Sequence, residues 1–176
     1  MKNIEVEVRS FISKEKYEQL LVWMKENAEF LSDDEQITYY FDCEEDLRIQ
    51  QNRYLSKVIL KKGKMYDEHR EEHELEFERE RFADLEKFFL ALGYGVEIKW
   101  FRVRNNFKWK GIDVAVDYTK GYGHVLEMEK MSTEEEKSQV LEELKQKTKE
   151  LGVELTPKEK LLESYEFYRK NWKDLV

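Results

Sequence analysis

Charged and branched apolar residues alternate near the start of the chain, in the sequence Ile4-Glu5-Val6-Glu7-Val8-Arg9. Successive side chains of a β-strand point to opposite faces, so Glu5, Glu7 and Arg9 share one face and the aliphatic residues share the other. Two carboxylates and a guanidinium in one row suit a site that binds a metal ion together with phosphate. The same row also suits the solvated face of an ordinary sheet.

Several later segments repeat this design, with charge on one face and apolar side chains on the other. They are Arg48 with Gln50, Lys57 with Lys61, the row from Glu72 to Glu78, Arg102 with Arg104, and Glu127 with Glu129. If amphipathic helices cover the apolar faces, the charged faces lie either in solvent on an open sheet or inside a closed barrel. A charged barrel lining would have to be functional, because unpaired buried charges cost several kcal/mol each. The periodicity alone favours the solvated sheet.

The composition limits the class of protein. A chain of 176 residues that is 40% apolar and 14% aromatic suits one domain with a substantial core. Its formal net charge of -8 argues against a nonspecific nucleic-acid binder, which needs surplus cations to neutralise phosphates. The sequence has neither the apolar run of a signal peptide nor about 20 apolar residues in a row, so a cytoplasmic protein is the simplest expectation. The single cysteine, Cys43, is expected to be a packing residue.

Periodicity predicts eight strands and four helices along the chain. The strands are expected at about 2–12, 36–42, 46–51, 54–62, 70–78, 96–107, 111–118 and 124–131. The helices are expected at 14–27, at 82–92, from 132 or 133 to about 151, and from 158 through 168. Ser13 is the expected N-cap of the first helix. Most connections are short, which favours antiparallel hairpins.

The segment Glu5-x-Glu7-x-Arg9 resembles the ExExK signature of the CYTH superfamily, the class IV adenylyl cyclases and thiamine triphosphatases, also called triphosphate tunnel metalloenzymes. Later pieces match the family in order, over nearly the whole chain. They are Tyr40-Phe41-Asp42, Leu47-Arg48-Ile49, Leu60-Lys61, a Glu-rich strand, Arg102 and Arg104, Asp117, Gly121-x-Gly123 and Glu127-x-Glu129. The resemblance implies an α+β fold, a closed eight-stranded antiparallel β-barrel with flanking helices, as a single domain over 1–176.

Three departures separate the sequence from the family pattern. Arg9 replaces the signature lysine, which keeps the charge but exchanges a compact ammonium for a forked donor. Gln50 replaces the second arginine of the usual Leu-Arg-Ile-Arg segment, which removes one cation. Glu163 replaces the lysine of a C-terminal Lys-Ser-Tyr, with Lys158 or Lys160 as candidate substitutes.

The resemblance also implies roles for the charged residues. Metal ligation is expected of Glu5, Glu7, Glu127 and Glu129, with Asp117 as an addition, and carboxylate oxygens suit Mg²⁺ or Mn²⁺. Binding of the phosphate oxygens is expected of Arg9, Arg48, Lys61, Arg102 and Arg104. Among these cations, Arg9 and Lys61 are expected to take part in catalysis. Glu74 and Glu76 are expected to hold the cations in position or to bind a second metal.

Three functions remain open at this point. The first is a metal-dependent hydrolase acting on tripolyphosphate, thiamine triphosphate or a nucleoside triphosphate. The second is a class IV adenylyl cyclase, which would need the same metal and cations, and the third is a noncatalytic polyphosphate or nucleotide binder. The expected partner is a small molecule that contains a triphosphate, and neither nucleic acid nor membrane is expected. The oligomeric state is left open, with a homodimer among the alternatives.

Overall fold

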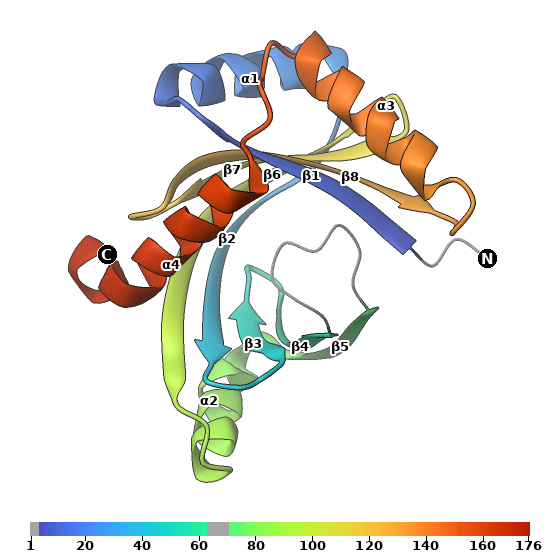
Figure 1. Cartoon of the computed structure of the whole chain (residues 1–176). Coiled ribbons are helices and arrows are strands. Elements are labelled where there is room, and N and C mark those ends of the chain that lie inside the picture. Colours follow the sequence, from blue (N-terminus) through green and yellow to red (C-terminus); the bar gives the residue numbers. More distant parts are fainter. Residues whose placement is uncertain (1–3, 63–70) are drawn as a thin grey trace.

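A single antiparallel sheet contains all the described strands, in the order β1-β8-β7-β6-β2-β3-β4-β5 (Figure 1). This computed structural model describes residues 4–62 and 71–176. The strands are β1 (Ile4–Ile12), β2 (Glu29–Phe41), β3 (Asp46–Gln51), β4 (Leu55–Lys62), β5 (Glu71–Glu78), β6 (Val96–Trp109), β7 (Ile112–Thr119) and β8 (Gly123–Ser132). Positions 2–3 and 70, which were predicted as strand, and the segment 63–68 between two predicted strands lie outside the described residues.

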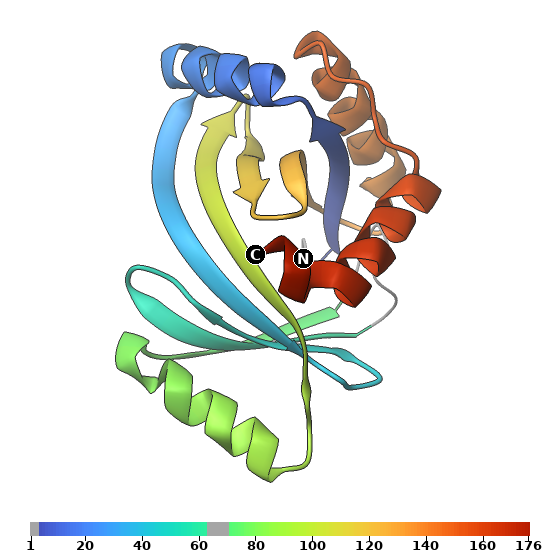
Figure 2. The same cartoon turned by 90° about the vertical axis from the view of Figure 1, so that its left-hand side faces the viewer.

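Four helices flank the sheet within the described ranges. They are α1 (Lys14–Asn27), α2 (Phe82–Ala91), α3 (Lys137–Glu150) and α4 (Lys158–Leu175), with a short 3-10 turn, η1 (Arg79–Arg81), before α2. The long strands β2 and β6 curve between the two halves of the sheet, which gives it a concave and a convex face (Figure 2). α1 and α3 cover the convex face at one end, α2 covers it at the other, and α4 crosses the concave side (Figures 1 and 2). No helix in the described part of the chain is both long and apolar enough to span a membrane.

The alternation predicted for the first strand is confirmed. Val6 and Val8 are 2% and 8% exposed and pack on the convex side with Leu20 and Met24 of α1. The intervening charged residues face the concave side, opposite Glu127 and Glu129 of β8 in the register. Helices therefore cover the apolar faces, as the sequence pattern required, and the charged faces meet in the concavity.

α4 is fixed to β6 by polar contacts as well as by aromatic packing. The Tyr168 hydroxyl donates to the Lys99 carbonyl at 2.9 Å, and the Trp172 Nε1 donates to the Glu97 carbonyl at 2.9 Å. The ring of Tyr168 packs edge-on against Trp100, with a centroid separation of 4.8 Å. These contacts hold the helix across one end of the concave face.

Three elements differ clearly from the prediction: β2, α3 and α4, of which α4 continues to Leu175, beyond the predicted residue 168. β2 begins at Glu29 rather than near 36. Its first half is polar and gives no apolar alternation in the sequence, but hydrogen bonds to β6 make it a strand. α3 begins at Lys137 rather than at 132 or 133. Residues 134–136 form a turn instead, in which the Thr133 hydroxyl accepts a hydrogen bond from the Glu136 amide at 3.3 Å.

The closed barrel that the family resemblance implied is not confirmed. β1 and β5 are the two edges of the sheet order, and no hydrogen-bonded ladder joins them in the described residues. A ladder between these strands would set the carboxylate row of β1 beside that of β5, and like charges placed opposite one another destabilise a sheet. The fold is therefore an α+β structure with an open, strongly curved eight-stranded sheet.

Two substitutions on α1 test how the helix is attached. Leu20→Ala is expected to lower the free energy of unfolding by about 2–5 kcal/mol, because Leu20 is 3% exposed in the core between α1 and the sheet. Val22→Ala on the same helix is expected to change it by less than about 0.5 kcal/mol, because Val22 is 61% exposed. Urea unfolding of both variants measures the difference, and equal effects would contradict the packing described above.

Candidate functional site

The concave face brings together charged residues from strands that are distant in sequence. The β1–β8 register places Glu7 opposite Glu129 and Arg9 opposite Glu127. Antiparallel pairing puts directly opposed residues on the same face of the sheet. Across this face lie the basic residues of β6, Arg102 and Arg104, and those of β3 and β4. The residues predicted to bind metal and phosphate thus share one surface.

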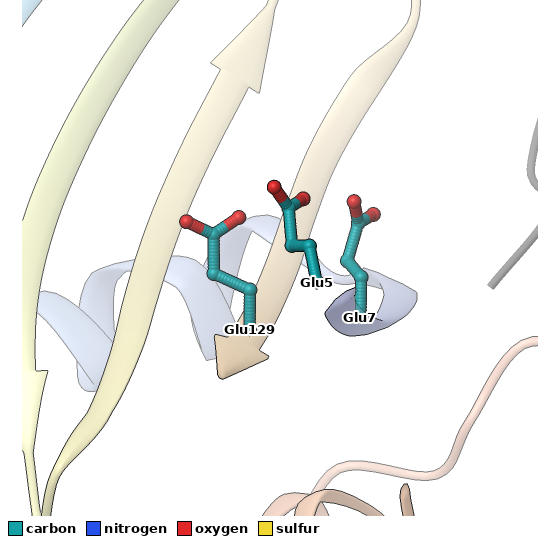
Figure 3. Close-up of side chains that lie close together, drawn as sticks. All are labelled: Glu5, Glu7 and Glu129. Atoms are coloured by element: carbon teal, nitrogen blue, oxygen red, sulfur yellow. The ribbon is translucent and has the colours of Figure 1, made fainter. Parts of the chain in front are cut away.

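Three carboxylates form a cluster at the β1 and β8 end of this surface. Oxygens of Glu5, Glu7 and Glu129 lie within 4.8 Å of one another, and Figure 3 shows the three side chains pointing to the same side. Burial, together with the neighbouring Glu127 and Glu5, raises the pKa of Glu129 to about 8. Burial also raises the pKa of Glu7, against the opposing effect of Arg9. The cluster therefore has more negative charge than the cations beside it offset.

Glu127 lies beside this cluster but has a different environment. Arg9 donates through Nε to its Oε2 at 2.7 Å, and Arg104 donates through Nη2 to its Oε1 at 2.6 Å. Burial alone would raise the pKa of Glu127, but the guanidiniums of Arg104, Arg9 and Arg102 outweigh burial and hold it well below the usual range. Arg9 also contacts Glu7. Glu127 is thus a neutralised carboxylate that links β1, β8 and β6.

Asp117 and the β6 arginines form the next part of the surface. Asp117 Oδ2 lies 3.5 Å from Arg104 Nη1 and 3.6 Å from Arg102 Nη1, and burial raises the pKa of this carboxyl in spite of both cations. Its other oxygen, Oδ1, is buried and has no hydrogen-bond partner among the described residues. Arg102 also donates through Nε and Nη2 to Gln36 Oε1, at 3.0 and 2.6 Å. A buried acceptor without a partner is costly, which is typical of a position that meets a ligand.

Arg48 lies on the opposite wall, on β3. Its Nη1 donates to the Tyr40 hydroxyl and its Nη2 to Asp46 Oδ2, both at 2.9 Å. Its Nε is buried without a partner in the described part of the chain. One N–H of a fixed guanidinium is therefore left available for an anion.

The two lysines of β4 are held by the carboxylate row of β5. Lys61 pairs with Glu72 at 2.5 Å. Glu74 and Glu76, predicted to position the phosphate-binding cations, instead contact Lys57, at 2.5 and 3.5 Å. Lys57 was missed as a site residue, although its position four residues before Lys61 puts both on one face of a strand. Lys57 lies directly opposite Gln50 in the β3–β4 ladder. It therefore places a cation beside the position where Gln50 replaces the second arginine of the family pattern.

The C-terminal residues that were compared with the family pattern differ in burial from the tyrosine beside them. Lys158, Lys160 and Glu163 are exposed on α4, whereas Tyr165 is buried with Trp100. Gln50 is buried on the concave side, where its Nε2 donates to the Thr38 hydroxyl at 3.1 Å.

Two hollows next to the charged residues give room for a ligand. One, of about 210 Å³, is lined by Glu127, Glu129, Arg104 and Asn106 among others. The second, of about 40 Å³, lies between Arg9, Arg102 and Asp117. Carboxylates that lack enough cations suit a hard divalent ion, and guanidiniums suit phosphate oxygens.

A curved antiparallel sheet with an acidic cluster and a cationic surface on its concave face defines a class of protein suited to metal-assisted binding of phosphorylated small molecules. More specifically, the chain belongs to the CYTH family, because the family profile of the CYTH domain matches residues 3–162.

Solved structures share this fold. A conserved hypothetical protein from Pyrococcus furiosus is 26% identical, with a TM-score of 0.70 over 85% of this chain and 91% of that one. A proposed adenylate cyclase from Vibrio parahaemolyticus is 15% identical, with a TM-score of 0.71 over 93% and 99%. A proposed adenylyl cyclase from Hippeastrum, described as having a dominant triphosphatase activity, is 22% identical, with a TM-score of 0.63 over 92% and 95%. Among curated protein sequences, none matches the chain.

The raised pKa of Glu129 gives a pH-dependent expectation for the metal-free protein. Folding raises this pKa from 4.5 to about 8. Because the native state holds the proton of Glu129 more tightly than the unfolded state does, protonation of Glu129 favours the native state. This contribution to the free energy of unfolding is complete below pH 4.5 and is lost as the pH rises through about 8. Glu129→Gln stays neutral at every pH, so it should unfold at the same urea concentration as the wild type near pH 4 and at a higher one near pH 9.

Urea unfolding in the presence of a chelator, at several pH values, measures this difference. Glu44→Gln is a matched control, because Glu44 is exposed in the turn between β2 and β3. A Glu129→Gln effect that is the same at all pH values would contradict the expectation.

Proposed function

We propose that the protein is a Mg²⁺- or Mn²⁺-dependent hydrolase of triphosphate substrates that binds them on the concave face. The observation that carries the proposal is the cluster of Glu5, Glu7 and Glu129, whose oxygens lie within 4.8 Å of one another beside the arginines of β1 and β6. A divalent ion would neutralise the carboxylate cluster, and a polyphosphate would neutralise the arginines. Neither ligand alone would neutralise both groups of charges.

The carboxylate cluster fits a divalent ion by the chemistry of its donors. Three carboxylates are a set that Mg²⁺ and Mn²⁺ accept, with waters and substrate oxygens completing the shell. Glu127 and Asp117, also predicted as ligands, lie next to the cluster, but their described contacts are to arginines. In our proposal they hold the cations in place, and the orphaned Asp117 Oδ1 is available to the ion or to its hydration shell.

The phosphate groups are bound by cations from both walls. Arg9, Arg102 and Arg104 lie on the β1 and β6 side, and Arg48 and Lys61 lie on the β3 and β4 side. Their partner carboxylates fix the orientation of each cation before substrate arrives, which lowers the cost of ordering them on binding. Lys57 adds positive charge opposite Gln50 and offsets the missing second arginine. In this proposal the ligand bridges the two walls of the concavity, whose edge strands, β1 and β5, are joined by no ladder in the described residues.

Catalysis then depends on positioning and charge. A bound Mg²⁺ or Mn²⁺ supplies a Lewis acid beside the phosphate oxygens. Arg9 and Lys61, on opposite walls, stabilise the charge that develops on the transferred phosphoryl group, as positioned cations do in phosphoryl transfer. Arg9 is linked to Glu7 of the cluster and to Glu127, so it spans the metal-binding and phosphate-binding regions.

An adenylyl cyclase is the second candidate. The fold likeness to a proposed adenylate cyclase extends over 93% of this chain and 99% of that one. The described activity of the Hippeastrum relative, a dominant triphosphatase, favours hydrolysis. Both reactions use the same metal and cations, so the choice depends on where the nucleoside is held and which group attacks.

A substrate panel tests the proposal. Tripolyphosphate, thiamine triphosphate, ATP and GTP are each incubated with Mg²⁺ or Mn²⁺, and orthophosphate, pyrophosphate and cyclic AMP are measured. Orthophosphate from at least one substrate is expected. Cyclic AMP with pyrophosphate from ATP would instead establish the cyclase. Calorimetry showing metal-linked binding of tripolyphosphate without turnover would indicate a noncatalytic binder, and no binding would overturn the proposal.

Two substitutions test the metal assignment. Glu7→Gln and Glu129→Gln are expected to lower kcat/KM by about 100-fold or more, because even partners of metal ligands cost about 10–100-fold when removed. Glu44→Gln makes the same chemical change at an exposed position and should leave the rate unchanged. Wild-type rates in both cluster variants would remove the metal site from the proposal.

A further inference from the structure

A third cavity lies mainly on the convex side of the sheet. It has a volume of about 530 Å³. Its lining includes Ile37, Phe101, Val103, Tyr118, Arg53 and Lys120, and we call it the convex groove. Ile37, Phe101 and Val103 belong to the face of β2 and β6 opposite that of Gln36 and Arg102. The groove therefore lies behind the strands that form the substrate wall.

The groove exists because two helices leave the middle of this face uncovered. At one border, Tyr118 packs on His124 with a ring separation of 4.8 Å, and His124 packs on Tyr17 of α1 at 4.7 Å. At the other border, the β3–β4 turn is tied to η1: Gln51 donates to the Arg79 carbonyl at 2.8 Å, and Arg79 donates to the Asn52 carbonyl at 3.0 Å. Val103, between these borders, is 37% exposed. Ring packing holds one border in place and hydrogen bonds hold the other, so the groove is preformed.

The charge around the groove is positive, in a chain whose formal net charge is -8. Arg53, Arg79 and Lys120 line it, against a single carboxylate, Glu35. The ion pair of Arg53 is weak, since its Nη1 lies 4.0 Å from Asp33 with both side chains more than half exposed. The described contact of Arg79 is to a backbone carbonyl rather than to an acid. An anion would therefore find cations that the protein has not neutralised.

We propose that the convex groove is a binding site for a small amphipathic anion, a molecule with a flat or branched apolar part and a phosphate, sulfonate or carboxylate group. A volume of about 530 Å³ suits a ligand of nucleotide or drug size. The apolar part contacts Phe101, Val103 and Tyr118, and the anionic group lies toward Arg53 and Lys120. Glu35 opposes the ligand's charge and limits its affinity.

This site is independent of the proposed phosphate chemistry. Two lining residues, Gln36 and Arg102, belong to the concave face: Arg102 donates to Gln36 Oε1 at 2.6 Å and lies 3.6 Å from Asp117. Binding in the groove thus needs neither the metal nor the carboxylate cluster. If the hydrolase proposal fails, the proposal of a ligand site in the groove is unaffected. If the groove proposal fails, the hydrolase proposal is unaffected.

Fluorescence titration with 8-anilinonaphthalene-1-sulfonate, an aromatic anion, tests the proposal. Saturable binding with one site per chain is expected. Arg53→Glu and Lys120→Glu should each weaken it by about fivefold, and Glu35→Gln should strengthen it, because each changes the charge next to the sulfonate. Val103→Glu should abolish it. Lys149→Glu, an exposed reversal on α3, is the control and should have no effect.

Competition and stability measurements complete the test. Phenyl phosphate should displace the dye, whereas inorganic phosphate at the same concentration should not. Displacement by inorganic phosphate alone would reduce the groove to an anion patch, and displacement only by an acidic peptide would make it a protein-docking surface; either result overturns the proposal. Displacement by tripolyphosphate with Mg²⁺ would place the dye in the concavity and overturn it too. Thermal unfolding of each variant near the wild-type temperature shows that lost binding is not lost folding.

Discussion

Glu127 is the carboxylate on which the concave face depends, because it neutralises guanidiniums from two other strands. Arg9 of β1 and Arg104 of β6 both donate to it, and it is 4% exposed. Removing one partner from a buried charge network leaves the others uncompensated, which is strongly destabilising. Because Glu127 and Asp117 take up the arginine charge, the remaining carboxylates have too few cations nearby. The concave face thus has one region in which carboxylates and guanidiniums neutralise each other, and one acidic region whose charge a cation could neutralise.

The acidic region costs stability, and the convex side offsets it. Folding buries Glu7 and Glu129 in surroundings that raise the pKa of both, so ionising them works against the native state. The hydrophobic cluster beneath α1 and α3, centred on side chains such as Met24 and Leu144 that have no exposed surface, stabilises the same strands from behind. Each of these strands thus packs the side chains of one face into the hydrophobic core and places those of its other face on the concave surface.

Much of this arrangement could be predicted from sequence, because strand periodicity depends only on backbone geometry. The alternation in Glu5-Val6-Glu7 fixed which side chains share a face, and Ser13 caps α1 as predicted, accepting from the Lys16 amide at 3.1 Å. Which cation meets which carboxylate depends on register between distant strands, so the pairing of Glu127 with Arg104, or of Glu74 with Lys57, could not be predicted. The polar first half of β2 could not be predicted as strand either, because it has no apolar alternation and is stabilised by its ladder with β6.

The pairing of β1 with β8 has a consequence for folding kinetics. The three clustered carboxylates come from positions 5, 7 and 129, so the cluster exists only after strands separated by more than a hundred residues have met. Contacts between such distant segments carry a large loop-closure entropy and slow the folding of β-rich chains. A divalent ion at the proposed site can stabilise the chain only once this pairing has formed. Metal binding should therefore slow unfolding far more than it accelerates folding.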